Sequence, residues 1–400
     1  MKYPQDKSIS LTKLFIIFLR LGCTSFGGPI AHIGFFHQEF VTKRKWYSED
    51  EFLQIVALCQ FLPGPASSQV GMALGLNARG YLGSITSFIA FTLPSALVMM
   101  TFAFLLSHSN FLADSSILHT LKLIAVAVVA QAIWSMYKSL NADKVKIIIA
   151  ITSAILALCF AGPFTQIIII FCAGLAGLIM CKHCSKQNTI ASAPANKKLS
   201  ILLIALFISI LVLSPFFTRF NTSDLSVIFD SFYRAGALVF GGGHVVLPLL
   251  ENELVKTGFI SNEEFLYGYS LAQAIPGPLF TFSTYLGALS ANENTEIVGA
   301  IIATLAIFLP GYLLVVALLP YWQTLRQNVK LNKSIAGINA SVIGLLIASF
   351  INPITMNSIS SLKDIVITLC LLAMLMLMKI SPFKVIMVSV FTALLFDLCK

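Results

Sequence analysis

The stretch YRAGALVFGGGHVVLPLLENEL, residues 233–254, combines an apolar, membrane-like sequence with residues that interrupt a helix. Each of its three consecutive glycines (241–243) weakens a helix by about 1 kcal/mol relative to alanine. Arg234 precedes the glycines and His244 follows them. A continuous membrane-spanning helix gains nothing from such residues. The stretch therefore predicts a helix that is broken at the glycines.

The composition of the chain predicts a membrane protein. Of its 400 residues, 57% are apolar and only 11% are charged, and the mean hydropathy is +0.88. Soluble domains are about 25% charged. Apolar stretches long enough to cross the roughly 30 Å hydrocarbon core recur along the chain. We therefore expect an all-α polytopic membrane protein, and a first segment that is not cleaved because it lacks a small-residue signal-peptidase site.

A second copy of the interrupted stretch lies near the N-terminus. FLRLGCTSFGGPIAHIGFFHQEFV (18–41) aligns with FYRAGALVFGGGHVVLPLLENELV (232–255), and an arginine, three glycines and a glutamate coincide. After one gap, SEDEFLQIVALCQFLPGP (48–65) aligns with SNEEFLYGYSLAQAIPGP (261–278). Core packing alone would preserve hydrophobicity rather than these particular residues. The chain therefore contains two copies of one membrane unit.

The repeat predicts how the chain is organised. Each copy contains about six apolar segments, and an unmatched apolar stretch, Leu199–Leu213, lies between the copies, which makes about 13 segments. Because each copy has an even number of segments, the single connecting segment inverts the second copy. Inverted repeats with broken or re-entrant helices are typical of secondary transporters. The expected parts are a first membrane repeat, a linker with the connecting span, and a second membrane repeat, at residues 1–182, 183–224 and 225–400.

The basic residues indicate the orientation in the membrane. With the N-terminus in the cytoplasm, 17 of the 26 Lys and Arg residues fall on the cytoplasmic side and 6 on the outer side, as the positive-inside rule requires. Half of the exceptions are Lys43, Arg44 and Lys45. They would move to the cytoplasmic side if the first two segments turned back as re-entrant hairpins. The sequence leaves both arrangements open.

The broken helices point to an anion site. Non-helical backbone is tolerated at membrane depth only where it is buried in protein or lines a cavity. Proline suits the first turn of a helix, and a helix start offers unpaired N–H groups and about half a positive charge to an anion. The chain has two glycine breaks and two Pro-Gly-Pro breaks, with hydroxyl residues after the latter. The predicted substrate-binding residues are Arg20, Gly27, Gly28, Pro65, Ser67, Ser68, Arg234, Gly241, Gly242, Gly243, His244, Pro278 and Thr281.

The two matched arginines favour a negatively charged substrate. An unpaired arginine within a span is costly, so Arg20 and Arg234 each need a partner or a function. No carboxylate is expected at the hydrophobic centre. The structural alternative is an ion pair with Glu39 or Glu253, or a side chain of Arg20 that reaches the interface.

These motifs resemble a known family. FGGP…E with FLPGPASSQ, and YRAG…FGGGHVVLP…E with QAIPGP, are similar to the chromate ion transporter family in its long, two-domain fused form, from about Thr12 to Leu395. The resemblance implies a multi-pass protein of the bacterial inner membrane that exports chromate and confers chromate resistance. It also implies that sulfate, which has the same tetrahedral shape and double negative charge, is a candidate substrate.

An enzyme is the alternative class. A membrane-embedded lipid-phosphate phosphatase needs a nucleophile beside an arginine clamp, but Ser67 and Ser68 have no arginine near them in the sequence, and the second copy has Phe280 and Thr281 instead. We therefore expect a transporter without catalytic residues or a cofactor, driven by the membrane potential, a proton gradient or both. Cys181 and Cys184 lack a second ligand pair, so no metal site is expected. The expected partners are the oxyanion and membrane lipid, with a homodimer left open and no nucleic acid.

Overall fold

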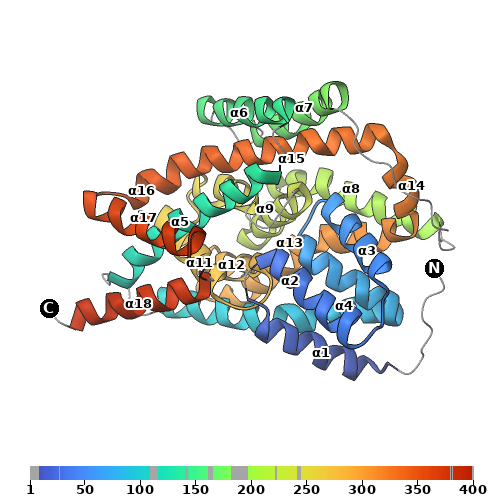
Figure 1. Ribbon diagram of the computed structural model, residues 1–400, viewed down its shortest axis with the longest axis horizontal. Helices are drawn as coiled ribbons and strands as arrows, with labels where there is room; N and C mark the ends of the chain where they lie inside the picture. The colour runs from blue at the N-terminus through green and yellow to red at the C-terminus, as the bar shows by residue number, and fades with distance from the viewer. Residues whose placement is uncertain are drawn as a thin grey trace.

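The computed structural model is helical throughout its regular elements (Figure 1). It describes residues 9–26, 28–108, 116–139, 143–160, 165–181, 197–220, 223–240, 245–378, 380 and 382–398. Within these ranges, five helices are long and apolar enough to cross a membrane, at 66–107, 119–138, 197–220, 296–321 and 329–358. These observations fit a polytopic membrane protein, as the composition predicts.

The elements follow one another in a similar order in the two halves of the chain. The first half contains α1 (Leu11–Thr24), α2 (Gly28–Phe36), π-helical η1 (His37–Lys43), α3 (Glu49–Phe61), α4 (Ala66–His108), α5 (Ser116–Ser139), α6 (Lys144–Cys159) and α7 (Thr165–Met180). Helix α8 (Lys197–Phe220) follows and contains the predicted connecting stretch. The second half contains α9 (Asp224–Leu238), α10 (Val246–Leu250), π-helical η3 (Glu251–Val255), α11 (Asn262–Ala274), η4 (Leu279–Thr281), α12 (Phe282–Leu289), α13 (Glu296–Leu318), η5 (Leu319–Tyr321), α14 (Trp322–Gln327), α15 (Val329–Ser349), π-helical η6 (Phe350–Thr355), α16 (Met356–Ser358), α17 (Leu362–Met376) and α18 (Pro382–Leu398).

Local sequence explains why α3 and α11 start at matching positions. Each helix begins at a capping box, in which a serine accepts a hydrogen bond from the backbone N–H three residues later. The glutamate at that later position accepts the N–H of the serine in return. The two pairs are Ser48 with Glu51 and Ser261 with Glu264. Such reciprocal caps satisfy N–H groups that a helix start would otherwise leave unpaired.

The described arms on either side of the first predicted break in each half lie against each other. In the first half, the ring centroids of Phe18 in α1 and Phe40 in η1 lie 5.2 Å apart. In the second half, Arg234 in α9 forms an ion pair of 2.7 Å with Glu253 in η3. Side chains on opposite sides of a break can meet in this way only if the two arms run antiparallel.

The Pro-Gly-Pro breaks are also reversals of the chain. The hydroxyl of Tyr47, just before α3, donates to the carbonyl oxygen of Leu74 in α4 at 2.9 Å. The hydroxyl of Tyr285 in α12 donates to the carbonyl oxygen of Glu264 in α11 at 2.8 Å. The breaks therefore form four helical hairpins, which we call hairpins 1 to 4 and which comprise residues 11–43, 49–78, 224–255 and 262–289.

Helix α4 contains a further reversal. Arg79 and Gly80 have non-helical backbone angles, and the hydroxyl of Ser87 donates to the carbonyl oxygen of Gly71 at 2.9 Å. A straight helix would hold these two residues far apart. The two parts of α4 therefore pack against each other on either side of residues 79–80, where the sequence predicts one apolar segment to end and the next to begin.

The first arms of the hairpins are short helices, as are α6, α7 and α17. Helices α1, α3, α9 and α11 contain 13 to 15 residues. At about 1.5 Å per residue each is about 20 Å long, whereas the hydrocarbon core is about 30 Å thick. The chain thus folds back within each of these segments, and their re-entry into a membrane stays a prediction.

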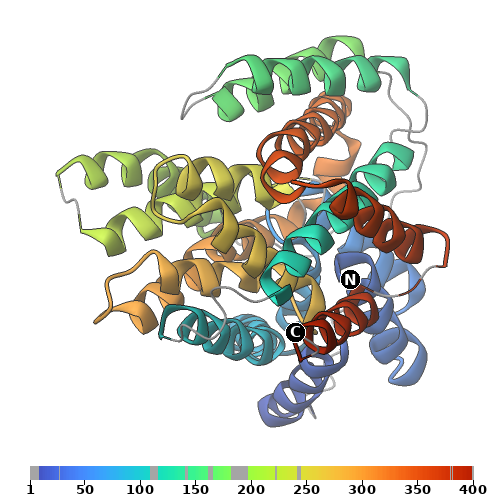
Figure 2. The same cartoon turned by 90° about the vertical axis from the view of Figure 1, so that its left-hand side faces the viewer.

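The two halves interlock rather than form separate bodies. Helices α6 and α7 of the first half pack against α15 of the second half, and α17 and α18 pack against α5. Figure 2 shows α6 and α7 lying over α15. The largest buried apolar cluster likewise contains residues from both halves, such as Ile124 and Phe232. The hairpins are held inside this shared framework.

Two glycines let the first arm of a hairpin approach its neighbour closely. A Cβ atom on Gly22 in α1 would lie 2.6 Å from the carbonyl oxygen of Phe91, and one on Gly236 in α9 would lie 2.2 Å from the carbonyl oxygen of Ile307. Both distances are too short for real contacts, and the obstacle is backbone rather than a flexible side chain. Small residues at helix contacts serve this purpose in membranes.

We predict that Gly236→Ala destabilises the protein by about 1–3 kcal/mol, because the methyl group overpacks the contact between α9 and α13. Gly34→Ala is the matched control, since no atom lies within 4 Å of the added Cβ. Alanine favours a helix over glycine by about 1 kcal/mol, so this control should be neutral or stabilising. Thermal unfolding in detergent measures both variants, and an unchanged Tm for Gly236→Ala would contradict the close packing.

Candidate functional site

The turns of the hairpins meet in pairs, and each pair joins the two halves of the chain. The N–H of Gly64, in the turn of hairpin 2, donates to the carbonyl oxygen of Val239 at 2.7 Å. The N–H of Gly277, in the turn of hairpin 4, donates to the carbonyl oxygen of Ser25 at 3.0 Å. We call this meeting place the crossing; its described residues are 25–26, 28, 62–65, 239–240 and 275–278.

The Pro-Gly-Pro sequence explains why these particular hydrogen bonds form. Proline has no N–H, so the glycine supplies the one backbone donor in each triplet. Gly64 and Gly277 have φ angles of +122° and +107°, a region that side chains disfavour. A Cβ on Gly277 would also lie 2.7 Å from the Oγ atom of Ser95. The turn thus needs glycine for its shape, its donor and its space.

His32 is a buried residue beside the crossing that the sequence analysis does not predict. It is 1% exposed, its Nε2 atom lies 3.1 Å from the carbonyl oxygen of Ser25, and its Nδ1 atom lies 3.4 Å from the Oγ atom of Ser67. Because a carbonyl only accepts hydrogen bonds, Nε2 carries the proton and Nδ1 accepts from the hydroxyl of Ser67. His32 therefore holds Ser67 in place. The carbonyl oxygen of Ser25 accepts hydrogen bonds from both His32 and the N–H of Gly277.

The repeat alignment concealed His32. Its counterpart in the second half is Val246, whereas His244 aligns with Ile30. Each half therefore has a histidine shortly after its glycine break, but the two are displaced by two positions. The signal that could have found His32 is the short distance in sequence between a histidine and a predicted helix start, without the requirement of a matched partner.

Several polar atoms near the crossing are buried without a hydrogen-bond partner. They are Oγ of Ser25, Oγ of Ser68 and Oε1 of Gln69; the amide nitrogen of Gln69 donates to the carbonyl oxygen of Pro63 at 2.8 Å. A buried polar group without a partner costs about 1–3 kcal/mol, and such groups are few in native proteins. These atoms are therefore available to a polar ligand.

The two halves place different polar residues near the crossing. The residues that align with Ser67 and Gln69 in the second half are Phe280 and Phe282, and both are buried. Thr281 aligns with Ser68, but its hydroxyl donates to the carbonyl oxygen of Pro278 at 2.8 Å. Oγ of Ser283, which aligns with Val70, is the buried hydroxyl without a partner that follows the turn in the second half. The geometry of the turns is thus shared by the halves, whereas the positions of the polar groups differ.

Arg234 is neutralised by carboxylates. Its Nη2 atom lies 2.7 Å from Oε2 of Glu253 and 3.0 Å from Oδ2 of Asp230, and Asp230 also accepts a hydrogen bond from Ser214. The expectation that no carboxylate lies at the centre is therefore wrong for this arginine, and the structural alternative of a Glu253 ion pair is present. Asp230 was detectable from its spacing of four residues on the same helix face.

Arg20 has a different environment from its repeat partner. It lies on the exposed side of α1, and it forms no ion pair with a described residue. Its expected partner, Glu39, is instead bound by Arg44 at 2.7 Å and approached by Lys43 at 3.8 Å. The matched arginines therefore do not have matched partners.

The remaining predicted residues divide into described and undescribed ones. Gly28 begins α2 with a φ of +77° and has no atom within 4 Å of a built Cβ. Pro65 and Pro278 are buried directly before α4 and η4. Gly27 and the stretch 241–244, with Gly241, Gly242, Gly243 and His244, lie outside the described residues, so their roles stay predictions. In the part of the chain that the structure describes, no three His, Cys, Asp or Glu side chains are grouped as a metal site requires.

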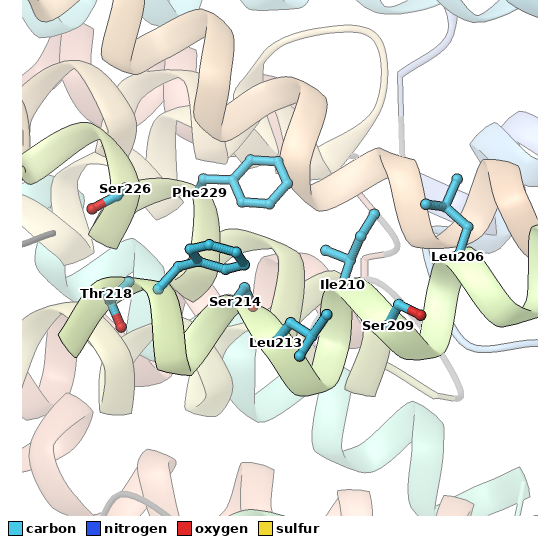
Figure 3. Close-up of a pocket in the computed structure, with 9 residues that line it drawn as sticks. Leu206, Ser209, Ile210, Leu213, Ser214, Thr218, Ser226 and Phe229 are labelled. Carbon is cyan, nitrogen blue, oxygen red and sulfur yellow. The ribbon is translucent and has the colours of Figure 1, made fainter. Parts of the chain in front are cut away.

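A groove between α8 and α9 is a poor anion site. It has a volume of about 510 Å³ and is lined by Leu206, Ser209, Ile210, Leu213, Ser214, Phe217, Thr218, Ser226 and Phe229. Figure 3 shows the side chains of Leu206, Ile210, Leu213 and Phe229 along it. The lining surface is almost wholly apolar, and a dianion that left water there would lose hydrogen bonds without replacement.

Comparison with known proteins identifies the family. The chain is 27% identical to the "Chromate transport protein" of Pseudomonas aeruginosa over 88% of its length and 81% of that protein. It is 29% identical to the "Probable chromate transport protein" of Synechococcus elongatus, over 84% and 83% of the two chains. It is 25% identical to the "Chromate transport protein" of Cupriavidus metallidurans, over 92% and 89%. No solved structure matches. The chromate transporter family matches residues 12–178 and 226–395, and the chain belongs to that family.

Proposed function

We propose that the protein exports chromate across the bacterial inner membrane and binds the anion at the crossing. The observation that carries this proposal is the pair of reciprocal hydrogen bonds, from Gly64 to Val239 and from Gly277 to Ser25. They gather non-helical backbone and unpartnered buried hydroxyls at one place in a chain of the chromate transporter family. Irregular backbone in a membrane is expected where it lines such a substrate site.

The groups at the crossing suit a tetrahedral oxyanion. The hydroxyls of Ser25 and Ser68 are short donors without a partner, and the starts of α2 and α4 add unpaired N–H groups close to them. Hydrogen bonds to an anion are about twice as strong as neutral ones, which offsets part of the lost hydration. Sulfate has the same shape and charge, so we expect it to compete with chromate.

The arginines have separate roles in this proposal. Arg20 lacks a described ion pair and is the cation available to an approaching anion. The charge of Arg234 is already matched by Asp230 and Glu253, so this residue holds the arms of hairpin 3 together and reaches the anion only after a carboxylate leaves it. The two arginines are both needed, but for different reasons.

The membrane potential suffices to drive export. Moving one charge across 100 mV is worth about 2.3 kcal/mol. A dianion that leaves a negative cytoplasm therefore gains about 4.6 kcal/mol, which corresponds to a gradient of about a thousandfold. Export on this scale would confer resistance to chromate without hydrolysis of ATP.

We further propose that hairpins 1 to 4 re-enter the membrane and that the second half is inverted. The segments that span the membrane are then 81–108, α5, α6 and α7 in the first half, and α13, α15, α17 and α18 in the second. Because four is even and α8 adds one, the halves face opposite sides. The basic cluster at 43–45 then lies in the cytoplasm, as the positive-inside rule favours.

The purified protein in liposomes tests the function directly. With a potassium gradient and valinomycin setting the potential, chromate flux should rise with potential and fall when sulfate is added. Arg20→Ala should lower the flux about tenfold, equivalent to about 1.4 kcal/mol, with an unchanged Tm. Flux no greater than that of protein-free liposomes would refute the proposed function, and full flux in Arg20→Ala would refute the role of that residue.

Labelling of single cysteines tests the inverted arrangement. With the native cysteines replaced, a cysteine at Ser48 should react with an impermeant maleimide from the cytoplasmic side, and one at Ser261 from the outer side. Both serines are exposed and cap matching helices, so the two substitutions cause similar strain. Labelling of both positions from the same side would mean that the repeats are parallel.

Gly277→Ala tests whether the crossing matters for transport. Alanine at this φ angle costs about 1 kcal/mol of backbone strain, and its Cβ would also crowd Ser95 and displace the hydrogen bond to Ser25. Gly258→Ala is the matched control, because Gly258 has a φ of +82° but no atom within 4 Å of the added Cβ. Chromate flux should fall in Gly277→Ala and persist in Gly258→Ala. Equal flux in the two variants would remove the crossing from the mechanism.

A further inference from the structure

Glu251 is a buried carboxylate that the proposed anion site does not use. It is 3% exposed at the start of η3, in the second arm of hairpin 3. It accepts a hydrogen bond from the hydroxyl of Ser349, while its Oε2 atom has no partner. No ion pair joins it to a described residue. A charged carboxylate in such a place is strongly disfavoured, so burial favours the protonated form.

The charged groups around Glu251 are committed elsewhere. Lys256, at the end of η3, attracts the charged form of Glu251 but lies beyond ion-pair distance. Glu253 in η3 is bound to Arg234, and Glu263 in the neighbouring α11 is bound to Lys122 at 2.8 Å. Ser349, at the end of α15, is the neutral group bound to Glu251, and Glu264 in α11 accepts the cap hydrogen bond of its own helix.

The backbone at Glu251 begins a π-helical segment, η3. The N–H of Lys256 donates to the carbonyl oxygen of Glu251 at 3.2 Å, which is the five-residue spacing of a π-helix. Ser349, the residue that donates a hydrogen bond to the side chain of Glu251, directly precedes another π-helical segment, η6. Short π-helical segments are rare and are frequent at functional sites. Glu251 thus links two such segments from different helices.

The repeat gives this position a titratable residue in both halves. His37 aligns with Glu251 and also begins a π-helical segment, η1. His37, however, is paired with Glu49 at 2.6 Å near the surface. The second half therefore has the buried, unpaired member of the two, just as the first half has the unpartnered hydroxyls of the crossing.

We propose that Glu251 is a proton-binding site whose loading and release are coupled to movement of the anion. Glu251 lies five residues along the arm from Val246, so a proton there sits about 8 Å along the helix from the start of α10. Loss of the proton would leave a bare charge in the protein, which the arm relieves by moving its π-helical segment towards water. Under the inverted arrangement, this arm opens to the outer side, where protons are more abundant.

This inference rests on the proposed transport of an oxyanion. One flux experiment distinguishes a failure of the proton coupling from a failure of the proposed transport. Full-length protein in liposomes of phosphatidylethanolamine and phosphatidylglycerol is held at fixed potential, with and without a pH gradient, and chromate is the probe. Wild-type flux should change several-fold with the gradient. Glu251→Gln should keep its potential-driven flux and lose the response to the gradient. Glu296→Gln, which alters another buried carboxylate at the start of α13, should respond like the wild type.

Infrared spectroscopy tests the proton site independently of any flux. At neutral pH the wild type should show the absorption band of a buried protonated carboxyl group, and Glu251→Gln should lack it. Ser349→Ala should keep the band but shift its frequency, because the hydrogen bond to Glu251 is lost. This second variant keeps the test valid if Glu251→Gln fails to fold. A band that persists in Glu251→Gln would overturn the proton site. A wild-type chromate flux that ignores the pH gradient would overturn the coupling and leave the proposed export intact, whereas no chromate flux at all would overturn the proposed export.

Discussion

The rest of the structure depends on a backbone constraint at two Pro-Gly-Pro triplets. A hairpin turn inside a membrane exposes peptide groups that water cannot reach. The triplet removes two of its donors, because proline has none, and leaves one N–H on glycine. That donor is satisfied by a carbonyl from the other half of the chain. Neither half can complete its own turns, so the two copies must fold around each other.

This mutual dependence explains why helices outside the hairpins pack against helices of the other half. Helices α6 and α7 cover α15, and α17 and α18 cover α5, so the framework around each pair of turns comes from both halves. Glycines at 22 and 236 bring the first arm of a hairpin into backbone contact with the neighbouring helix. Close packing of this kind fixes the arms on either side of the turns.

Much of the fold could be predicted from the sequence, because broken helices, glycines and prolines are local signals. The repeat and the four breaks depend on residues that lie close together in the chain. The antiparallel direction of the arms could not be predicted, because it rests on contacts such as Phe18 with Phe40 across a break. Hydropathy alone describes a span and a hairpin of equal length identically.

The candidate site was less predictable, because the repeat preserves geometry more faithfully than chemistry. The alignment suggested that matched residues share roles, yet Arg234 is bound by two carboxylates while Arg20 is exposed. The residues without a match, His32 and Asp230, are those that organise the crossing and the ion pair.

The unequal halves also have a consequence for transport. A two-fold framework in which both halves offered the same donors would present two equal anion sites, and two dianions at such short range would repel each other strongly. Here Ser67 and Gln69 of the first half are replaced by Phe280 and Phe282 in the second, and Ser68 by Thr281, whose hydroxyl is bound to the carbonyl oxygen of Pro278. If the crossing binds the anion as we propose, the symmetry of the turns serves motion towards either side of the membrane, while the asymmetry of the side chains favours a single anion.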